Sequence, residues 1–193
     1  MINLITFDLD DTLWDVRPAL IKAEQAQNVW LQQHYPRAIE NRDSHDLNQR
    51  KKDLIKQQPN LIHHISRFRQ IFLEQLLLDA GVPPNEACEA AMQAFGAFIA
   101  RRNDVELFKH AESVLEELNQ DYTLAALTNG NADVSQTPLA AFFSFALKAE
   151  DVGAAKPAPD LFLAAMAQAN SSPEQIVHVG DSHDHDIVGA HGV

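Results

Sequence analysis

Two aspartates near the start of the chain, Asp8 and Asp10, are separated by one residue. In extended backbone, residues at this spacing project to the same side of the chain, so we expect the two carboxylates to lie together. A third acidic residue, Asp181, follows an apolar segment far along the chain. Three carboxylates that meet would repel one another unless one were protonated or a cation were bound. Because oxygen ligands suit a small hard cation, the sequence predicts a magnesium site.

Residues that can hold a phosphate lie between these acidic groups. Thr128 and Asn129 end another apolar segment and offer hydroxyl and amide donors, and the backbone N–H of Gly130 adds a third. Lys156 is one of only three basic residues outside residues 16–103. Its charge beside an acidic cluster would attract an anion. We therefore expect a phosphate to bind beside the cation.

The segments that precede these polar groups are short and apolar. They predict strands over residues 4–7, 122–127, 142–147 and 175–179. Amphipathic patterns over residues 110–120 and 159–169 predict helices. Strands and helices that alternate in this way form parallel sheets with crossover helices, so the predicted fold class is α/β with a doubly wound parallel sheet. Such sheets bind ligands at the carboxyl ends of their strands, which is where the polar clusters fall.

Residues 16–103 follow a different pattern, because their apolar residues recur at helical spacing. The clearest helix is predicted over residues 61–80, and Gly81 stands where a C-terminal cap is expected. We expect residues 1–15 and 104–193 to form the α/β core. Residues 16–103 then form an all-helical domain inserted after the first strand.

Charge is distributed unevenly along the 193 residues. The chain has 15 basic and 27 acidic residues, a net charge of −12, and residues 16–103 hold 12 of the basic and 9 of the acidic ones. The strongly acidic remainder argues against a nucleic-acid partner.

Composition also bears on the compartment. No apolar run approaches the roughly 18 residues of a membrane span, and the first residues do not resemble a signal peptide. The single cysteine, Cys88, cannot form an internal disulfide, so we expect a cytoplasmic protein. Because Cys88 has small neighbours in the fourth predicted helix, we expect its side chain to be buried.

Taken in order, these motifs resemble those of the haloacid dehalogenase superfamily of phosphohydrolases. The first motif, Asp-x-Asp-x-Thr, is met by Asp8, Asp10 and Thr12. The later motifs are met by Thr128, Lys156, Gly180, Asp181 and Asp186. The resemblance covers nearly the whole chain. It implies that the helical insert is a cap domain.

The resemblance implies a two-step phosphoryl transfer that uses Mg²⁺. Asp8 would attack phosphorus to form an aspartyl-phosphate, and Asp10 would act first as general acid and then as general base. The Mg²⁺ ligands would be the Asp8 carboxylate, the Asp10 backbone carbonyl and Asp181. Dehalogenase members of the family lack the acid/base aspartate two residues after the nucleophile, so Asp10 favours a phosphatase.

The remaining motif residues would bind phosphate or support the site. Thr128 and Lys156, with Asn129 beside them, would hold the phosphoryl oxygens as charge develops on them. Thr12 and Asp186 would support the loops.

A narrower resemblance is to the bacterial flavin mononucleotide and aminouracil phosphatases of riboflavin metabolism. It is carried by residues 7–15, 17–18, 128–132 and 178–181. It implies a small phosphate monoester as substrate, such as flavin mononucleotide or a related nucleotide or ribityl phosphate. We expect this metabolite as the partner, no nucleic acid or membrane, and a monomer or weak homodimer.

Three other functions stay open. A hydrolase of the same superfamily could act on another substrate, such as a sugar phosphate. A phospho-accepting receiver domain also combines aspartates, a threonine and a lysine on a doubly wound sheet, but it accepts phosphate after a middle strand and has no large helical insert. A catalytically silent partner-binding relative is disfavoured by the intact motif residues.

Two further features complete the sequence predictions. His178, His183, His185 and His191 lie near acidic residues and could bind a transition metal, although the superfamily offers no such site. Only 12 residues follow Asp181. Since the superfamily continues through at least one more strand and helix, we expect the chain to be a C-terminally shortened form.

Overall fold

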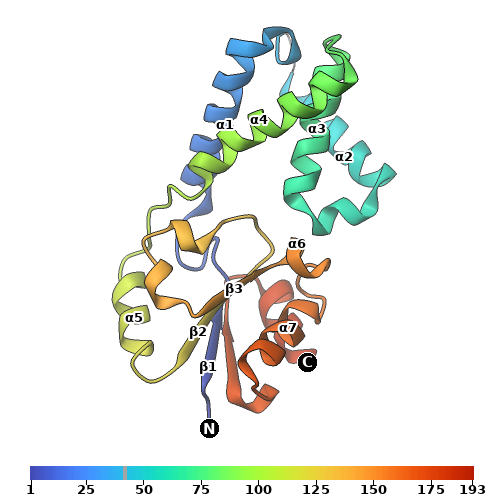
Figure 1. The fold of residues 1–193 in the computed structure, drawn as a ribbon. Helices are drawn as coiled ribbons and strands as arrows, with labels where there is room; N and C mark the ends of the chain where they lie inside the picture. Colours follow the sequence, from blue (N-terminus) through green and yellow to red (C-terminus); the bar gives the residue numbers. More distant parts are fainter. Residues whose placement is uncertain (41–42) are drawn as a thin grey trace. The chain divides into compact units, whose positions relative to one another are not determined.

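The computed structural model describes residues 1–40 and 43–193, so residues 41 and 42 of the predicted helical insert lie outside the described residues. The chain divides into two compact units (Figure 1). One consists of Met1–Ala19 and Asn103–Val193, and we call it the α/β unit. The other, Leu20–Arg102, is the helical unit. Each is described by itself.

The α/β unit is built on a sheet of four parallel strands. The strands are β1 (Leu4–Phe7), β2 (Thr123–Thr128), β3 (Phe145–Lys148) and β4 (Ile176–Val179). Their order is β3-β2-β1-β4, and Phe7 lies in register with Ala126 and Val179. The carboxyl ends of β1, β2 and β4 therefore meet at one edge. Every residue of β1 is buried, as expected for an interior strand of a parallel sheet.

Helices cover both faces of this sheet (Figure 1). Helix α5 (Ala111–Leu118) packs on the face that includes Phe7. Helix α7 (Asp160–Ala169) packs through Phe162 on Leu127, which points to the opposite face. The predicted doubly wound α/β fold is thus confirmed. The shorter helices of this unit are η3 (Val134–Gln136), η4 (Ala140–Phe142), α6 (Ala149–Val152), η5 (Pro173–Gln175), the π-helix η6 (His183–Val188) and α8 (Gly189–His191).

The described part of the helical unit contains helices and no strand. They are α1 (Val16–His34, whose first turn belongs to the α/β unit), η1 (Pro36–Ala38), α2 (Ser44–Gln57), η2 (Pro59–His63), α3 (Ile65–Asp79) and α4 (Pro84–Arg102). Alanines on α4 pack against Leu73 and Leu77 of α3. Their small side chains let these two helices approach closely.

Two details of the helical unit differ from the sequence prediction. The helix predicted from residue 61 begins at Ile65, because η2 precedes it and His64 between them has a non-helical backbone (φ −129°, ψ 67°). The prediction that Cys88 is buried is wrong. The buried stripe of α4 passes through Ala87, and the next residue is turned about 100° away from it towards solvent.

The expectation for Gly81 holds. Gly81 ends α3 with φ +86°, a left-handed conformation that glycine adopts without strain, so the predicted cap is confirmed. Among the described residues, no helix is both long and apolar enough to cross a membrane.

Candidate active site

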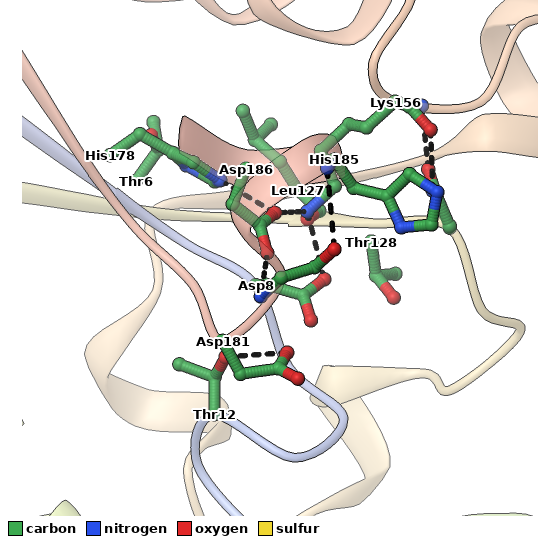
Figure 2. Close-up of polar contacts among 12 residues, drawn as sticks. Thr6, Asp8, Thr12, Leu127, Thr128, Lys156, His178, Asp181, His185 and Asp186 are labelled. Carbon is green, nitrogen blue, oxygen red and sulfur yellow. Dashed lines mark hydrogen bonds and ion pairs between the residues drawn. The ribbon is translucent and has the colours of Figure 1, made fainter. Parts of the chain in front are cut away.

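The polar residues predicted from the sequence gather at the carboxyl end of the sheet. Asp8 directly follows β1, Thr128 ends β2, and Asp181 lies two residues beyond β4. Lys156 comes from the connection between α6 and α7. Figure 2 shows these side chains converging. A cavity of about 280 Å³ opens there, lined by Asp8, Asn129, Lys156, Asp181, Ser182, His185 and Asp186.

The Lys156 ammonium group lies at the centre of the site. Its Nζ donates to Asp8 Oδ1 at 2.9 Å and to Asp186 Oδ1 at 2.6 Å. A third bond goes to the backbone oxygen of Leu127 at 2.7 Å. An ammonium group has three hydrogens, so each has an acceptor within the protein. The hydrogen bonds of Lys156 thus hold two buried carboxylates. The phosphate-binding role predicted for Lys156 stays a prediction.

Asn129 fixes the backbone of Lys156. Asn129 Nδ2 donates to the Lys156 carbonyl at 2.9 Å, and Asn129 Oδ1 accepts from the Lys156 N–H at 2.7 Å. The amide nitrogen carries a second hydrogen that can serve a phosphate oxygen. Thr128 Oγ1 accepts from the N–H of Gly130 at 3.0 Å, which shapes the turn after β2. Its hydroxyl hydrogen can still be donated. The phosphate-binding roles predicted for Thr128 and Asn129 stay predictions.

The Asp8 carboxylate is buried, and Lys156 offsets only part of the cost of burying its charge. Burial raises the pKa of Asp8 to about 6, well above the 3.8 of an exposed aspartate. The charge and hydrogen bond of Lys156 pull the pKa down, while the nearby charge of Asp186 raises it further. Any additional positive charge in the cavity would favour the ionised form, which is the form that can act as a nucleophile.

Asp186 is held through both oxygens. Oδ1 lies 2.6 Å from Lys156 Nζ and 3.0 Å from His178 Nε2, and Oδ2 accepts from the N–H of Ser182 at 3.0 Å. Burial alone would raise the pKa of Asp186, but hydrogen bonds from His178 and Lys156, with the charge of Lys156, hold it well below its usual range. A Cβ on Gly180 would overlap the Asp186 carboxyl group, so glycine is required there for this close approach.

A divalent cation would fit beside these carboxylates. Oxygens of Asp8, Asp181 and Asp186 all lie within 4.8 Å of one another. Carboxylate oxygens are the donors that Mg²⁺ prefers. Since both oxygens of Asp186 are already hydrogen-bonded, Asp8 and Asp181 are better placed to be ligands. Thr12 Oγ1 donates to Asp181 Oδ1 at 3.4 Å and so links the first loop to the last.

Asp10 lies outside this group of three carboxylates. Its Oδ1 accepts from the indole N–H of Trp14 at 2.9 Å, and Trp14 is fully buried. Asp11, between them, has φ +61° and donates its N–H to the Trp14 carbonyl at 2.8 Å. The loop that follows β1 is therefore a tight turn that packs on the Trp14 indole. Its geometry orients the Asp10 carboxylate, and the predicted acid/base and metal-binding roles of Asp10 stay predictions.

Three polar residues of the site have roles that the sequence patterns did not reveal. His185 lines the cavity although its side chain is exposed. His178 contacts Asp186, and Thr6 contacts His178, outside the cavity lining (Figure 2). A histidine and a threonine within short apolar strands are a weak signal. The distinction between His178 and His185 depends on the direction of each side chain, which spacing alone does not give.

A sequence profile of the family described as haloacid dehalogenase-like hydrolase matches residues 2–193. The chain belongs to the haloacid dehalogenase-like hydrolases. It is 33% identical over 189 residues to the Escherichia coli (strain K12) protein named 5-amino-6-(5-phospho-D-ribitylamino)uracil phosphatase YigB, a match that covers 98% of this chain and 79% of the relative. It is 35% identical over 129 residues to a phosphoserine phosphatase of Thermus thermophilus, which covers 64% of this chain and 50% of that protein.

A solved structure gives a closer match in sequence. The crystal structure described as 2-haloacid dehalogenase from Pseudomonas syringae pv. Tomato DC3000 has a TM-score of 0.94 and 41% identity, covering 100% of this chain and 83% of that one. The family match and the phosphatase relatives confirm the predicted superfamily and enzyme class. This haloacid dehalogenase-like hydrolase is a phosphoric monoester hydrolase that acts on small phosphate esters.

Proposed function

We propose that this hydrolase removes the phosphate group from a nucleotide or ribityl phosphate, such as flavin mononucleotide or a phosphoribitylamino-uracil, with the help of Mg²⁺. The observation that carries the proposal is the contact of Asp8 with Lys156 at 2.9 Å, in a cavity also lined by Asp181. The relative named YigB supports the ribityl class of substrate. The helical unit would serve as the cap that selects the rest of the substrate.

In the first step, a carboxylate oxygen of Asp8 forms a bond to phosphorus while the bond from phosphorus to the ester oxygen breaks. Asp10 gives its proton to the departing oxygen, so the alcohol leaves neutral. The phosphoryl group is then carried on Asp8 as an acyl phosphate. The charge of Lys156 stabilises the negative charge that develops on the phosphoryl oxygens.

In the second step, Asp10 takes a proton from a water molecule. The water oxygen bonds to phosphorus as the bond from phosphorus to Asp8 breaks, which releases inorganic phosphate and restores both side chains. A divalent cation bound by Asp8 and Asp181 would supply positive charge that offsets the repulsion between the carboxylates and the phosphate.

Hydrolysis of an aryl phosphate in the presence of Mg²⁺ tests the chemistry. We expect activity from the natural chain and none from Asp8→Asn, because an amide cannot form the acyl phosphate. Asp184→Asn is the matched control, since that exposed side chain pairs with His183 and does not line the cavity. Unchanged turnover by Asp8→Asn would rule out the proposed nucleophile.

A panel of phosphorylated metabolites tests the substrate class. It contains flavin mononucleotide, a ribityl phosphate, sugar phosphates and phosphoserine, each compared by kcat/KM. Flavin and ribityl phosphates are expected among the best substrates. If they rank among the poorest, the substrate assignment is wrong while the phosphatase chemistry stands.

The relative described as a 2-haloacid dehalogenase gives a second candidate, release of halide from a 2-haloacid. The resemblance that favours a phosphatase rests on Asp10, which the dehalogenase members of the family lack. Halide release from 2-chloropropionate, measured beside phosphate release, separates the two reactions. We expect phosphate release alone.

A further inference from the structure

A line of buried polar groups extends behind Asp186, away from the cavity. His178 Nε2 lies 3.0 Å from Asp186 Oδ1, and His178 Nδ1 lies 2.8 Å from the hydroxyl oxygen of Thr6. Thr6 and His178 face each other in register across β1 and β4. The side chain of His178 is 3% exposed and Thr6 is 1% exposed. Neither residue lines the cavity that holds Asp8 and Asp181.

The hydrogen positions along this line follow from the chemistry of its ends. The ionised Asp186 carboxylate can only accept, so His178 Nε2 must carry the proton between them. Burial lowers the pKa of His178, which keeps the ring neutral and leaves Nδ1 as an acceptor. The Thr6 hydroxyl is then the donor to Nδ1. Its alternative acceptor, the carbonyl of Val177, is farther away at 3.4 Å.

The His178 ring is also fixed by packing. Phe162 of α7 meets it edge to face, with ring centroids 5.1 Å apart and an interplanar angle of 89°. The imidazole therefore has one defined orientation, with a hydrogen bond at each nitrogen and an aromatic ring beside it. Its N–H reaches the same oxygen of Asp186 that accepts from Lys156.

We propose that Thr6 and His178 are positioning residues for phosphate ester hydrolysis, which act by orienting Asp186 so that Lys156 stays directed at the nucleophile Asp8. Thr6 selects the tautomer of His178, and His178 fixes the rotation of the Asp186 carboxylate. The order of contacts is Thr6, His178, Asp186, Lys156 and Asp8. This role rests on the proposed function, because it has meaning only if Asp8 is the nucleophile.

Paired variants of Thr6 test the proposal. Thr6→Val keeps the shape and removes the hydroxyl, whereas Thr6→Ser keeps the hydroxyl. We expect Thr6→Val to lower kcat for an aryl phosphate by about tenfold or more, with KM within about twofold, the order of effect seen when outer partners of a site are removed. Thr6→Ser should restore most of kcat. His178→Gln, which can still donate to Asp186, should retain more activity than His178→Leu.

Thr137→Val is the matched control. It also removes a buried hydroxyl, which donates to the Val134 carbonyl oxygen at 2.8 Å. Thr137 does not line the cavity that holds Asp8 and Asp181. We expect this variant to lose stability but to keep kcat. An equal loss of kcat in Thr137→Val and Thr6→Val would overturn the proposal, because the effect would then follow from destabilisation alone.

Nitrogen-15 NMR of the histidine rings gives a readout that needs no activity. His178, assigned by loss of its signals in His178→Gln, is expected as the neutral form with the proton on Nε2, and Thr6→Val should shift its Nδ1 signal. A proton on Nδ1 in the natural chain would overturn the proposal. If the NMR result holds but the natural chain hydrolyses no phosphate ester, the proposed function fails, and the positioning role fails with it for a different reason.

Discussion

A single ammonium group, that of Lys156, lies between two carboxylates that behave in opposite ways. Burial raises the pKa of Asp8 to about 6, whereas the added bonds from His178 and Ser182 help to keep the pKa of Asp186 well below its usual range. At neutral pH Asp186 is thus a permanent counter-ion for Lys156. The pKa of Asp8 lies close to neutral pH, so the charge of Asp8 responds to any charged group that enters the cavity.

The raised pKa of Asp8 predicts how stability depends on pH in the metal-free protein. Between pH 3.8 and about 6 the folded protein keeps the Asp8 proton that the unfolded chain has lost, so the contribution of this group to stability falls as pH rises. Asp8→Asn removes the titration. We expect the free energy of unfolding of the natural chain, relative to Asp8→Asn, to fall by roughly 2–3 kcal/mol across this window. Urea unfolding at several pH values measures it, and a rise would contradict the prediction.

His185 predicts a contact with substrate at the rim of the cavity. Its side chain lines the cavity that contains Asp8 and Lys156, while that of His183 pairs with Asp184 at 3.0 Å. His185→Ala is expected to raise KM for a phosphate ester several-fold, because a ring donor beside the phosphate is lost. His183→Ala is the control and should leave KM unchanged. Steady-state kinetics on one substrate test this prediction. Equal KM values for the two variants would show that His185 does not contact the substrate.

At the scale of elements, the turn between β4 and η6 depends on a residue without a side chain. In Gly180→Ala the new methyl group would overlap the carboxyl of Asp186, which must then shift and so disturb its contact with Lys156. We expect a loss of about 1–3 kcal/mol of stability, together with a loss of kcat. Chemical denaturation and aryl phosphate turnover measure the two effects.

Gly96→Ala is the matched control for that substitution. Gly96 lies within α4, and a Cβ there would meet open space. Alanine favours a helix over glycine, so this variant should be up to about 1 kcal/mol more stable. If Gly180→Ala behaved in the same way as Gly96→Ala, the close packing of Asp186 against Gly180 would not matter.

The elements themselves could largely be predicted from the sequence, because apolar spacing reports which face of a segment is buried. The strand that precedes Asp8 and the cap at Gly81 are examples. The full set of partners around Lys156 could not be predicted. It depends on the register that places β4 beside β1, which joins residues more than 100 positions apart, and on the turn that brings Asp186 back to Lys156, 30 positions earlier in the chain. Cys88 was misplaced because a one-residue step on a helix reverses burial.

At the scale of the whole molecule, cation binding is expected to stabilise the fold. A ligand that binds the folded state alone raises the free energy of unfolding by about 2.7 kcal/mol when present at 100 times its Kd. We expect Mg²⁺ to raise the Tm of the natural chain by several degrees, and Asp181→Asn to abolish the rise. Asp184→Asn, exposed and outside the cavity, should retain it. Thermal unfolding with and without Mg²⁺ is the measurement, and equal rises in both variants would place the cation elsewhere.

The position of β1 in the sheet has a consequence for the order in which the protein folds during synthesis. Leu4 pairs with Thr123 on one side and Ile176 on the other, so β1 lies between two strands that are both synthesised after it. The helical unit, in contrast, is one continuous segment, Leu20–Arg102, in which the consecutive helices α3 and α4 pack against each other. It can leave the ribosome and fold while β1 still has no neighbour. We therefore expect the helical unit to fold before the α/β unit, whose candidate active site is complete only after β4 and Asp186 have been synthesised.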